Sequence, residues 1–145
     1  MMPQDANIAG NVFGGTILKM VDEICYVAAT KHARTNIVTA SVDSMRFLSP
    51  VHVGDLLTLK ARVNAVWRTS MEVGVRIEAE DPRTGDIRHT GSSYMTVVAL
   101  DESERPCEVP ELVLETHEDE RRNQEARRRR ARRLEEKAID KALSS

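Results

Sequence analysis

The stretch NVFGGTILKMVDE, residues 11–23, joins a pair of glycines to the start of an amphipathic helix. At about 100° per residue, the apolar side chains that follow the glycines fall on a single arc of about 140°. They are Ile17, Leu18, Val21, Ile24, Cys25, Ala28 and Ala29. This pattern predicts a helix over about residues 16–32 whose apolar stripe packs against another element.

Two carboxylates in this segment fall on different parts of the predicted helix. Glu23 lies on the polar arc, where Lys19 can pair with it, so a solvated surface charge is the simplest interpretation. Asp22 lies at the edge of the apolar stripe, where an acid costs free energy unless it is hydrogen-bonded or used in chemistry. From its position alone, Asp22 is equally compatible with a structural and a catalytic role.

Gly14 and Gly15 stand at the beginning of this helix. Unpaired backbone N–H groups at a helix N-terminus attract an oxyanion, and glycines allow a carbonyl group to approach closely. The alternative interpretation is a flexible hinge before the helix. No GxxxxGK[ST] or GxGxxG motif is present to favour a nucleotide site.

After residue 36 the apolar spacing changes to a period of two, although it alternates only partly in residues 37–48. Strands are expected over about residues 37–48, 57–67, 71–80 and 86–100, with a turn at Gly54-Asp55 and a hairpin loop at DPRTG, residues 81–85. In the third of these strands Glu72 falls on the polar side of the alternation. One helix followed by four strands predicts an α+β fold, in which the helix covers the apolar face of a mostly antiparallel sheet.

Residues 115–145 differ in composition from residues 1–114, which we expect to form the main domain. A second helix is expected from about Thr116 to Leu143, and three acidic residues, Glu118, Asp119 and Glu120, begin it in accord with the helix dipole. Residues 121–133 contain eight arginines and one glutamate. Because this middle part is too rich in arginine to pack on a core, we expect it on the surface or against a neighbouring subunit.

Bulk properties exclude several classes of protein. The 145 residues, 41% of them hydrophobic, suit one compact core. Cys25 and Cys107 have no metal-binding spacing, so reduced thiols in a cytoplasmic protein are expected. No apolar run reaches the roughly 18 residues of a membrane span, and no secretory signal is visible. The scattered histidines and the lack of HExxH or GxSxG motifs predict neither a metal site nor a serine hydrolase.

Three stretches together resemble the hotdog-fold acyl-CoA thioesterases: MMPQDANIAGNVFGGTILKMVDE (1–23), TNIVTASVDSMRFLSPVHVGD (35–55) and WRTSMEVGVRIEAED (67–81). The resemblance is to the brain acyl-CoA hydrolase-type group of cytosolic acyl-CoA thioester hydrolases and its single-domain bacterial relatives. It covers about residues 1–114 and extends more loosely into the arginine-rich helix. It implies a long helix wrapped by an antiparallel sheet, and a homodimer whose two sheets run together, commonly assembled as a trimer of dimers. Members of the family usually have a short strand before the segment that matches Met1-Met2.

The resemblance also implies roles for individual residues. Asp22 would be the general base or the nucleophile, and Asn7 of the partner subunit would orient water or the carbonyl group. The backbone N–H groups at Gly14 and Gly15 would polarise the thioester. Coenzyme A, as part of the substrate and product, would be bound by Ala40, Ser41, Val42, Thr69, Ser70, Met71 and an arginine of the last helix, for which we choose Arg130. Arginine suits phosphate because its donors form a fork, and no separate cofactor or metal is required.

The predicted function is therefore hydrolysis of the thioester of fatty acyl-CoA to free acid and coenzyme A. A hydratase or dehydratase of the same fold would want a histidine beside the acid, and residues 1–31 contain none. A nucleic-acid binder would use the arginine-rich helix, but that helix lacks interleaved aromatic residues and is flanked by acidic ones. For Thr69-Ser70, the ordinary end of a hairpin is the alternative to a coenzyme contact.

Overall fold

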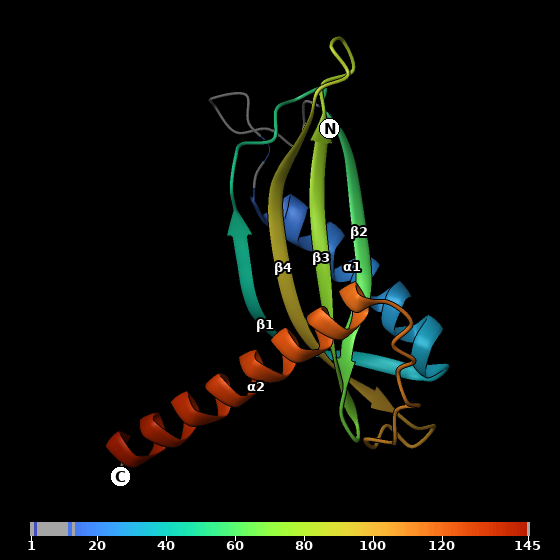
Figure 1. The fold of residues 1–145 in the computed structure, drawn as a ribbon, viewed down its shortest axis with the longest axis vertical. Coiled ribbons are helices and arrows are strands. Elements are labelled where there is room, and N and C mark those ends of the chain that lie inside the picture. Colours follow the sequence, from blue (N-terminus) through green and yellow to red (C-terminus); the bar gives the residue numbers. More distant parts are fainter. Residues whose placement is uncertain (1, 3–11, 13, 145) are drawn as a thin grey trace.

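The computed structural model describes residues 2, 12 and 14–144. The elements in chain order are α1 (Gly14–Ala33), β1 (Asn36–Phe47), β2 (Leu56–Val66), β3 (Ser70–Glu80), β4 (Ile87–Leu100) and α2 (His117–Ser144), as Figure 1 shows. This arrangement confirms the predicted α+β fold, and the helices and strands begin and end close to the expected residues.

The four strands form one sheet in the order β1-β4-β3-β2, and each neighbouring pair is antiparallel. Strand β1 therefore pairs with the last strand rather than with the next one, and it lies at an edge of the sheet. The register aligns segments that are far apart in the sequence. Val97 of β4 lies opposite Thr39 on one side and Met71 on the other. The two segments predicted to bind coenzyme A thus flank the same part of β4.

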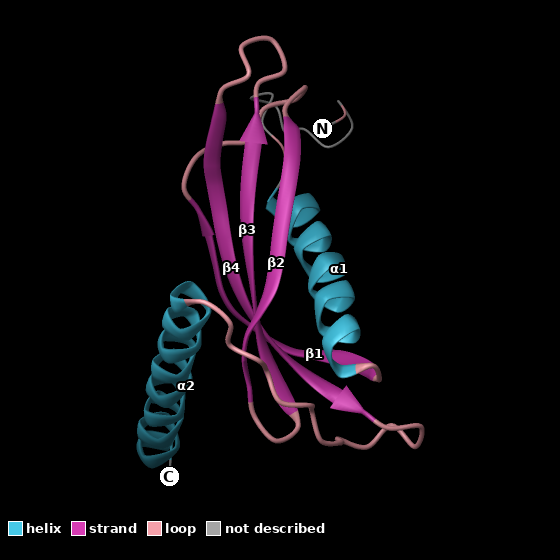
Figure 2. Ribbon diagram, turned by 45° about the vertical axis from the view of Figure 1, so that its right-hand side comes forward, coloured by secondary structure: helices cyan, strands magenta, loops and turns pink. Residues whose placement is uncertain are grey.

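Helix α1 covers one face of the sheet (Figure 2). Its inward stripe repeats every four residues and consists of Ile17, Val21, Cys25, Ala29 and Ala33, all of them buried. These side chains pack against alternate residues of β3 and β4, including Met71, Val73, Met95 and Val97. Burying one large apolar side chain of this kind stabilises the fold by about 1.5–3 kcal/mol. The predicted stripe of the first helix is confirmed.

Helix α2 lies on the opposite face of the sheet from α1 (Figures 1 and 2). Thr116 caps it: the Asp119 N–H donates to the Thr116 hydroxyl at 3.1 Å, and the Thr116 N–H donates back to the Asp119 carboxylate at 3.2 Å. Ala126 is fully buried against the domain, whereas Leu134, Ile139 and Leu143 are exposed where the helix runs beyond the sheet. The expectation of a surface helix agrees with this arrangement, because no described residue of α2 belongs to the hydrophobic core and its arginine-rich middle lies on the outer face of the sheet through polar contacts.

Strand β1 departs from the alternation that its sequence suggests. The pairing with β4 shifts register between Thr39 and Ser41 and again between Val42 and Ser44. A register shift of one residue moves the following side chains to the other face of a sheet. Thr39 accordingly points toward α1, while Ser41 lies opposite Thr96, whose side chain belongs to the face under α2.

Neither described helix is long and apolar enough to cross a lipid bilayer.

Candidate active site

Asp22 lies on the side of α1 that faces the edge strand β1. Its Oδ1 accepts a hydrogen bond from the Thr39 hydroxyl, with 2.9 Å between the oxygens, and both residues are exposed. No other hydrogen bond to this carboxylate comes from the described part of the chain. Asp22 is therefore not a sealed structural acid, because most of its hydrogen-bonding capacity is open at the surface of a single subunit.

Two neighbours of Asp22 clarify its setting. Burial, followed by the negative charge of Asp22, raises the pKa of the Cys25 thiol to about 12. Cys25 is thus a neutral core residue and not a nucleophile. Glu23 is exposed, as predicted, but within residues 14–144 it forms no ion pair with Lys19. Glu23, which follows Asp22 directly, is therefore a surface carboxylate without an ion pair among the described residues. This makes it a suitable control position for Asp22.

Gly14 and Gly15 are the first two residues of α1, and both are exposed. The first turn carries no acidic side chain, so the positive end of the helix dipole is not neutralised by one there. A Cβ at Gly14 would lie 3.2 Å from Cζ of Phe47, whereas a Cβ at Gly15 would meet nothing within 4 Å. A cavity of about 390 Å³ lies beside this end of α1 and is lined mainly by apolar residues such as Ile17, Phe47 and Val51.

The segments predicted to bind coenzyme A differ in what they expose. Ala40, Ser41 and Val42 are exposed on the edge strand, and the Ser41 hydroxyl donates to Asp43 Oδ1 at 2.7 Å. Thr69 and Ser70 are partly exposed at the start of β3, but the Met71 side chain is fully buried in the core. Met71 therefore offers no side-chain contact to a ligand on the surface of the domain.

The structure places Arg130 beside Ser70, at the start of β3. Its Nη1 donates to the Ser70 hydroxyl at 3.3 Å, and its guanidinium lies 4.4 Å from the centroid of the Trp67 ring. The guanidinium of Arg127 lies 5.8 Å from the same ring. Neither arginine has an ion-pair partner among the described residues. Two uncompensated cations thus lie over Trp67, beside a serine hydroxyl.

Arg129, by contrast, is tightly paired. Its Nε and Nη2 donate to the two carboxylate oxygens of Glu72 at 2.9 and 2.8 Å, and the Asn64 side chain donates to Oε2 at 3.0 Å. The guanidinium also stacks 3.7 Å from the centroid of Tyr94. Burial lowers the pKa of Arg129, but the hydrogen bonds and charge of Glu72 raise it by more, so it is raised overall. Glu72 lies on the polar side of the strand, as the alternation predicted, but it is fully buried there because α2 covers it.

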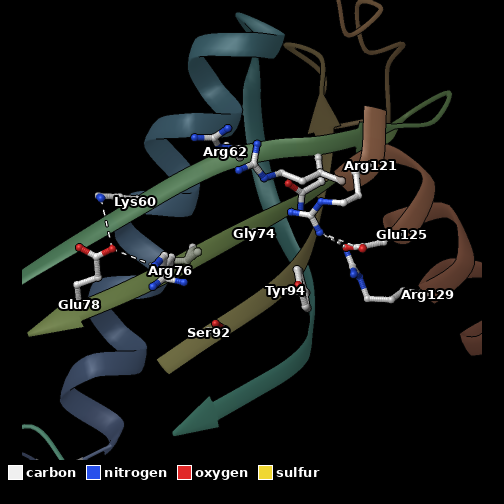
Figure 3. Close-up of a pocket in the computed structure, with 13 residues that line it drawn as sticks. Lys60, Arg62, Gly74, Arg76, Glu78, Ser92, Tyr94, Arg121, Glu125 and Arg129 are labelled. Carbon is white, nitrogen blue, oxygen red and sulfur yellow. Dashed lines mark hydrogen bonds and ion pairs between the residues drawn. The ribbon is translucent and has the colours of Figure 1, made fainter. Parts of the chain in front are cut away.

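A groove of about 370 Å³ runs between the outer face of the sheet and α2 (Figure 3). Its cations are largely balanced. Lys60 and Arg76 both pair with Glu78, and Arg121 pairs with Glu118 and Glu125. The hydrogen bond from Arg76 is the largest of the contributions that lower the pKa of Glu78. Despite its many arginines, this groove is a charge-balanced surface, unlike the surface at Trp67.

Sequence reasoning missed Thr39, Trp67 and the pair of Glu72 and Arg129. Thr39 was part of a recognisable stretch, but its contact with Asp22 depends on how β1 packs beside α1. The predicted role of Asn7 concerns a residue outside those that the structure describes. Within the described residues no group of three side chains could hold a metal ion.

Comparison with known proteins gives consistent matches. The thioesterase superfamily profile matches residues 9–85. An uncharacterized acyl-CoA thioester hydrolase of Bacillus subtilis is 38% identical over 119 residues, which are 82% of this chain and 69% of that protein. The structure of an apo-hexameric acyl-CoA thioesterase superposes with a TM-score of 0.92 at 41% identity, covering 96% of this chain and 89% of that one.

A second solved structure contains ligands. It is an acyl-CoA hydrolase of Staphylococcus aureus in complex with butyryl coenzyme A, coenzyme A and coenzyme A disulfide, with a TM-score of 0.85, 38% identity and coverage of 100% of this chain and 91% of that one. Three further structures of that hydrolase have alanine in place of an aspartate, an asparagine or a threonine.

Proposed function

Since the chain belongs to the thioesterase superfamily, we propose that it is an acyl-CoA hydrolase, which cleaves the thioester of fatty acyl-CoA to the free acid and coenzyme A. In this reaction water adds to the carbonyl carbon, the C–S bond breaks, and the coenzyme leaves as its thiol after taking up a proton. The chemistry needs a group that activates water or attacks the carbonyl, donors for the developing oxyanion, and a surface for the coenzyme. It uses coenzyme A as part of the substrate and requires no separate cofactor.

The observation that carries the proposal is the exposed Asp22 held by Thr39. A carboxylate that keeps free lone pairs at an open surface can act as a general base or a nucleophile, and the hydrogen bond restricts its orientation. The Staphylococcus aureus substitutions support this assignment, because the three altered positions have the same separations along that chain as Asn7, Asp22 and Thr39 have here. Asn7 is proposed to orient the water or the carbonyl group.

The oxyanion donors are proposed to be the N–H groups at Gly14 and Gly15. The exposed glycines of the first turn of α1, which carries no acidic side chain, suit the charge that develops on the carbonyl oxygen. One well-placed donor of this kind typically stabilises the transition state by about 3 kcal/mol. The apolar cavity beside Ile17 and Phe47 is a suitable place for part of the acyl chain.

Helix geometry supports a site made by two subunits. At 1.5 Å per residue, Gly14 and Asp22 of one helix lie about 12 Å apart along its axis, too far for both to touch one reacting carbonyl. The exposed edge strand β1, with Val38 48% and Val42 45% exposed, offers a surface where a second copy could extend the sheet. We propose a dimer in which the acid of one subunit meets the glycines and Asn7 of its partner, assembled further as a trimer of dimers.

Coenzyme binding is proposed at the strand segments on both sides of β4. The exposed residues Ala40–Val42 and the Thr69-Ser70 end of β3 present backbone and hydroxyl groups, and Met71 contributes through its backbone only. Arg130, which is uncompensated and supported by Trp67, is proposed to bind a phosphate of the coenzyme. The Staphylococcus aureus hydrolase, which binds butyryl coenzyme A and coenzyme A, supports this class of substrate.

The test is thiol release from acyl-CoA by the wild type and by Asp22→Ala, with Glu23→Ala as the matched control. Removing the general base should lower kcat by at least about 100-fold, whereas Glu23→Ala, which removes an exposed carboxylate one residue away, should leave it unchanged. Far-UV circular dichroism and size-exclusion chromatography should be alike for all three proteins. Full turnover by a folded Asp22→Ala protein would refute the catalytic assignment.

Hydration of enoyl-CoA is the alternative within the same fold, and a direct assay separates it from hydrolysis. The described histidines do not favour it. His32 contacts the Pro110 carbonyl and His89 contacts Gly91 and Ser92, so neither ring is hydrogen-bonded to Asp22. Formation of a hydroxyacyl-CoA without thiol release would favour the hydratase.

A further inference from the structure

Several polar contacts attach helix α2 to the sheet, and two of them come from arginines that lie one helical turn apart. Arg129 forms its two hydrogen bonds with Glu72 on β3, and Arg133 Nε lies 3.6 Å from Asp43 Oδ1 on β1. Asp43 in turn accepts a hydrogen bond from Thr96 of the intervening strand β4. Since Asn123 also donates to the Asn64 carbonyl on β2, the helix crosses all four strands, and these two inward arginines are paired with buried or nearly buried carboxylates.

From this arrangement we propose that Glu72 is a positioning residue for coenzyme recognition: through Arg129 it sets the rotation and register of α2, so that Arg130 stays between Trp67 and Ser70. The inference rests on the proposed function, because it concerns how the phosphate-binding arginine is held. Glu72 itself touches no substrate.

The chemistry of the Glu72–Arg129 pair suits the positioning of α2 better than a contribution to stability alone. A fully buried carboxylate is costly, and well-packed apolar residues of the same volume often serve stability equally well or better. A bidentate pair between a carboxylate and a guanidinium is directional, however, because the two parallel hydrogen bonds form only when the two planar groups have one relative orientation. The donor from Asn64 and the ring of Tyr94 further restrict Arg129. An apolar contact would let the helix slide or rotate, whereas this pair does not.

The pair of Glu72 and Arg129 restrains the position of Arg130. It follows Arg129 directly, so any rotation of the helix at Arg129 displaces the next side chain by a similar angle. Its side chain is flexible and contacts only Trp67 and Ser70 among the interactions that the structure shows. A cation without a carboxylate partner is available for an anionic ligand, and the paired cation beside it keeps the backbone in place.

The experiment compares two substrates with the same acyl chain, one on coenzyme A and one on pantetheine, which lacks the phosphates. We expect Glu72→Gln and Arg129→Ala to raise KM for the acyl-CoA about tenfold, the effect of losing one charged hydrogen bond, with kcat nearly unchanged. Rates on acyl-pantetheine should stay at the wild-type value. The matched control is Arg128→Ala, which removes an equal charge from an exposed neighbouring position and should change neither substrate.

Trp67 provides a second readout that does not depend on activity, because it is the single tryptophan of the chain. If Glu72 holds α2, its loss should uncover the Trp67 ring, shift its emission to the red and increase quenching by iodide. Arg128→Ala should leave both signals unchanged. Where Glu72→Gln or Arg129→Ala does not fold by circular dichroism, Arg129→Lys takes its place, since it keeps the charge but loses the fork, and a selective rise in KM is expected again.

The outcomes separate the possibilities. A selective rise in KM for acyl-CoA together with the emission shift supports positioning by Glu72. An equal loss on both substrates shows a merely structural role and overturns the proposal, and so does the absence of any change. Equal use of both substrates by the wild type also overturns it, because the phosphates would then not be recognised. Failure of the wild type to hydrolyse either substrate instead refutes the proposed function, while Trp67 emission still reports whether Glu72 holds the helix.

Discussion

The hydroxyl of Thr39 on β1 donates to the carboxylate of Asp22 on α1 across 2.9 Å, and this bond connects the helix to the exposed edge of the sheet. It holds an acid that would otherwise rotate freely at the surface. The contact is possible because Thr39 lies opposite Val97, whose side chain belongs to the buried face under α1, and the register shift affects only the residues that follow.

Replacing Thr39 by valine removes the hydroxyl but keeps the shape of the side chain. We expect kcat for acyl-CoA hydrolysis to fall about tenfold, because the acid loses a hydrogen bond that orients it. The melting temperature should hardly change, since the site is exposed. The matched control is Thr58→Val on the exposed surface of β2. If both variants keep full activity, Thr39 does not orient the acid.

Gly15→Ala should affect stability and activity in opposite directions. None of the described residues comes within 4 Å of a Cβ there. Alanine is favoured over glycine by roughly 0.5–1 kcal/mol in a helix interior and by less at this second residue of α1, so the melting temperature should rise slightly. The methyl group would nevertheless occupy the space through which the carbonyl group approaches, and kcat/KM should fall. Thermal unfolding and thiol release measure the two effects. A variant that is more stable and fully active would show that no carbonyl approaches Gly15.

Asp119→Asn should weaken the start of α2 in a pH-dependent manner. The Glu115 N–H, followed by the Thr116 N–H, holds the pKa of Asp119 below its ordinary 3.8. A lowered pKa in the folded state means that the carboxylate stabilises the fold above pH 3.8, and that this contribution disappears as the pH falls through the lowered value.

Urea unfolding at pH 7 and at pH 3, followed by circular dichroism, tests this prediction. The wild type should be more stable than Asp119→Asn at pH 7, and the difference should be smaller at pH 3. Glu120→Gln is the control, because that exposed acid lies on the same turn but contacts only His117, at 3.8 Å. An equal difference at both pH values would mean that the charge of Asp119 contributes nothing.

Local patterns were sufficient for most of the fold. The stripe from Ile17 to Ala29 and the alternation in β3 depend on neighbours in the sequence, and the structure confirms them. The alternation expected for β2 holds as far as Val63, where a register shift in the pairing with β3 interrupts it. The partial alternation noted in β1 had a cause that sequence could not reveal. Its two register shifts depend on pairing with β4, and no property of residues 36–47 alone determines where a strand will be interrupted.

Some residues of the candidate site could likewise be found from local sequence, and others only from the tertiary structure. Asp22 was recognised because a carboxylate at the border of an apolar stripe is locally conspicuous, and Arg130 was chosen from a run of similar arginines through a resemblance. The structure distinguishes those arginines by their partners: Arg129 pairs with buried Glu72, whereas Arg130 lies over Trp67 beside Ser70. Glu72 had the appearance of an ordinary polar residue of a strand, since its burial depends on α2, whose Arg129 lies 57 positions away in the sequence.

By itself, the sequence determined the helices, the strands and the conspicuous acid, because hydrophobic periodicity and turn chemistry act over a few neighbouring residues. Only the tertiary structure decided which hydroxyl orients that acid and which arginine is paired. Those choices depend on strand order, register and the placement of α2 across the sheet, where residues distant in the chain come within hydrogen-bonding distance.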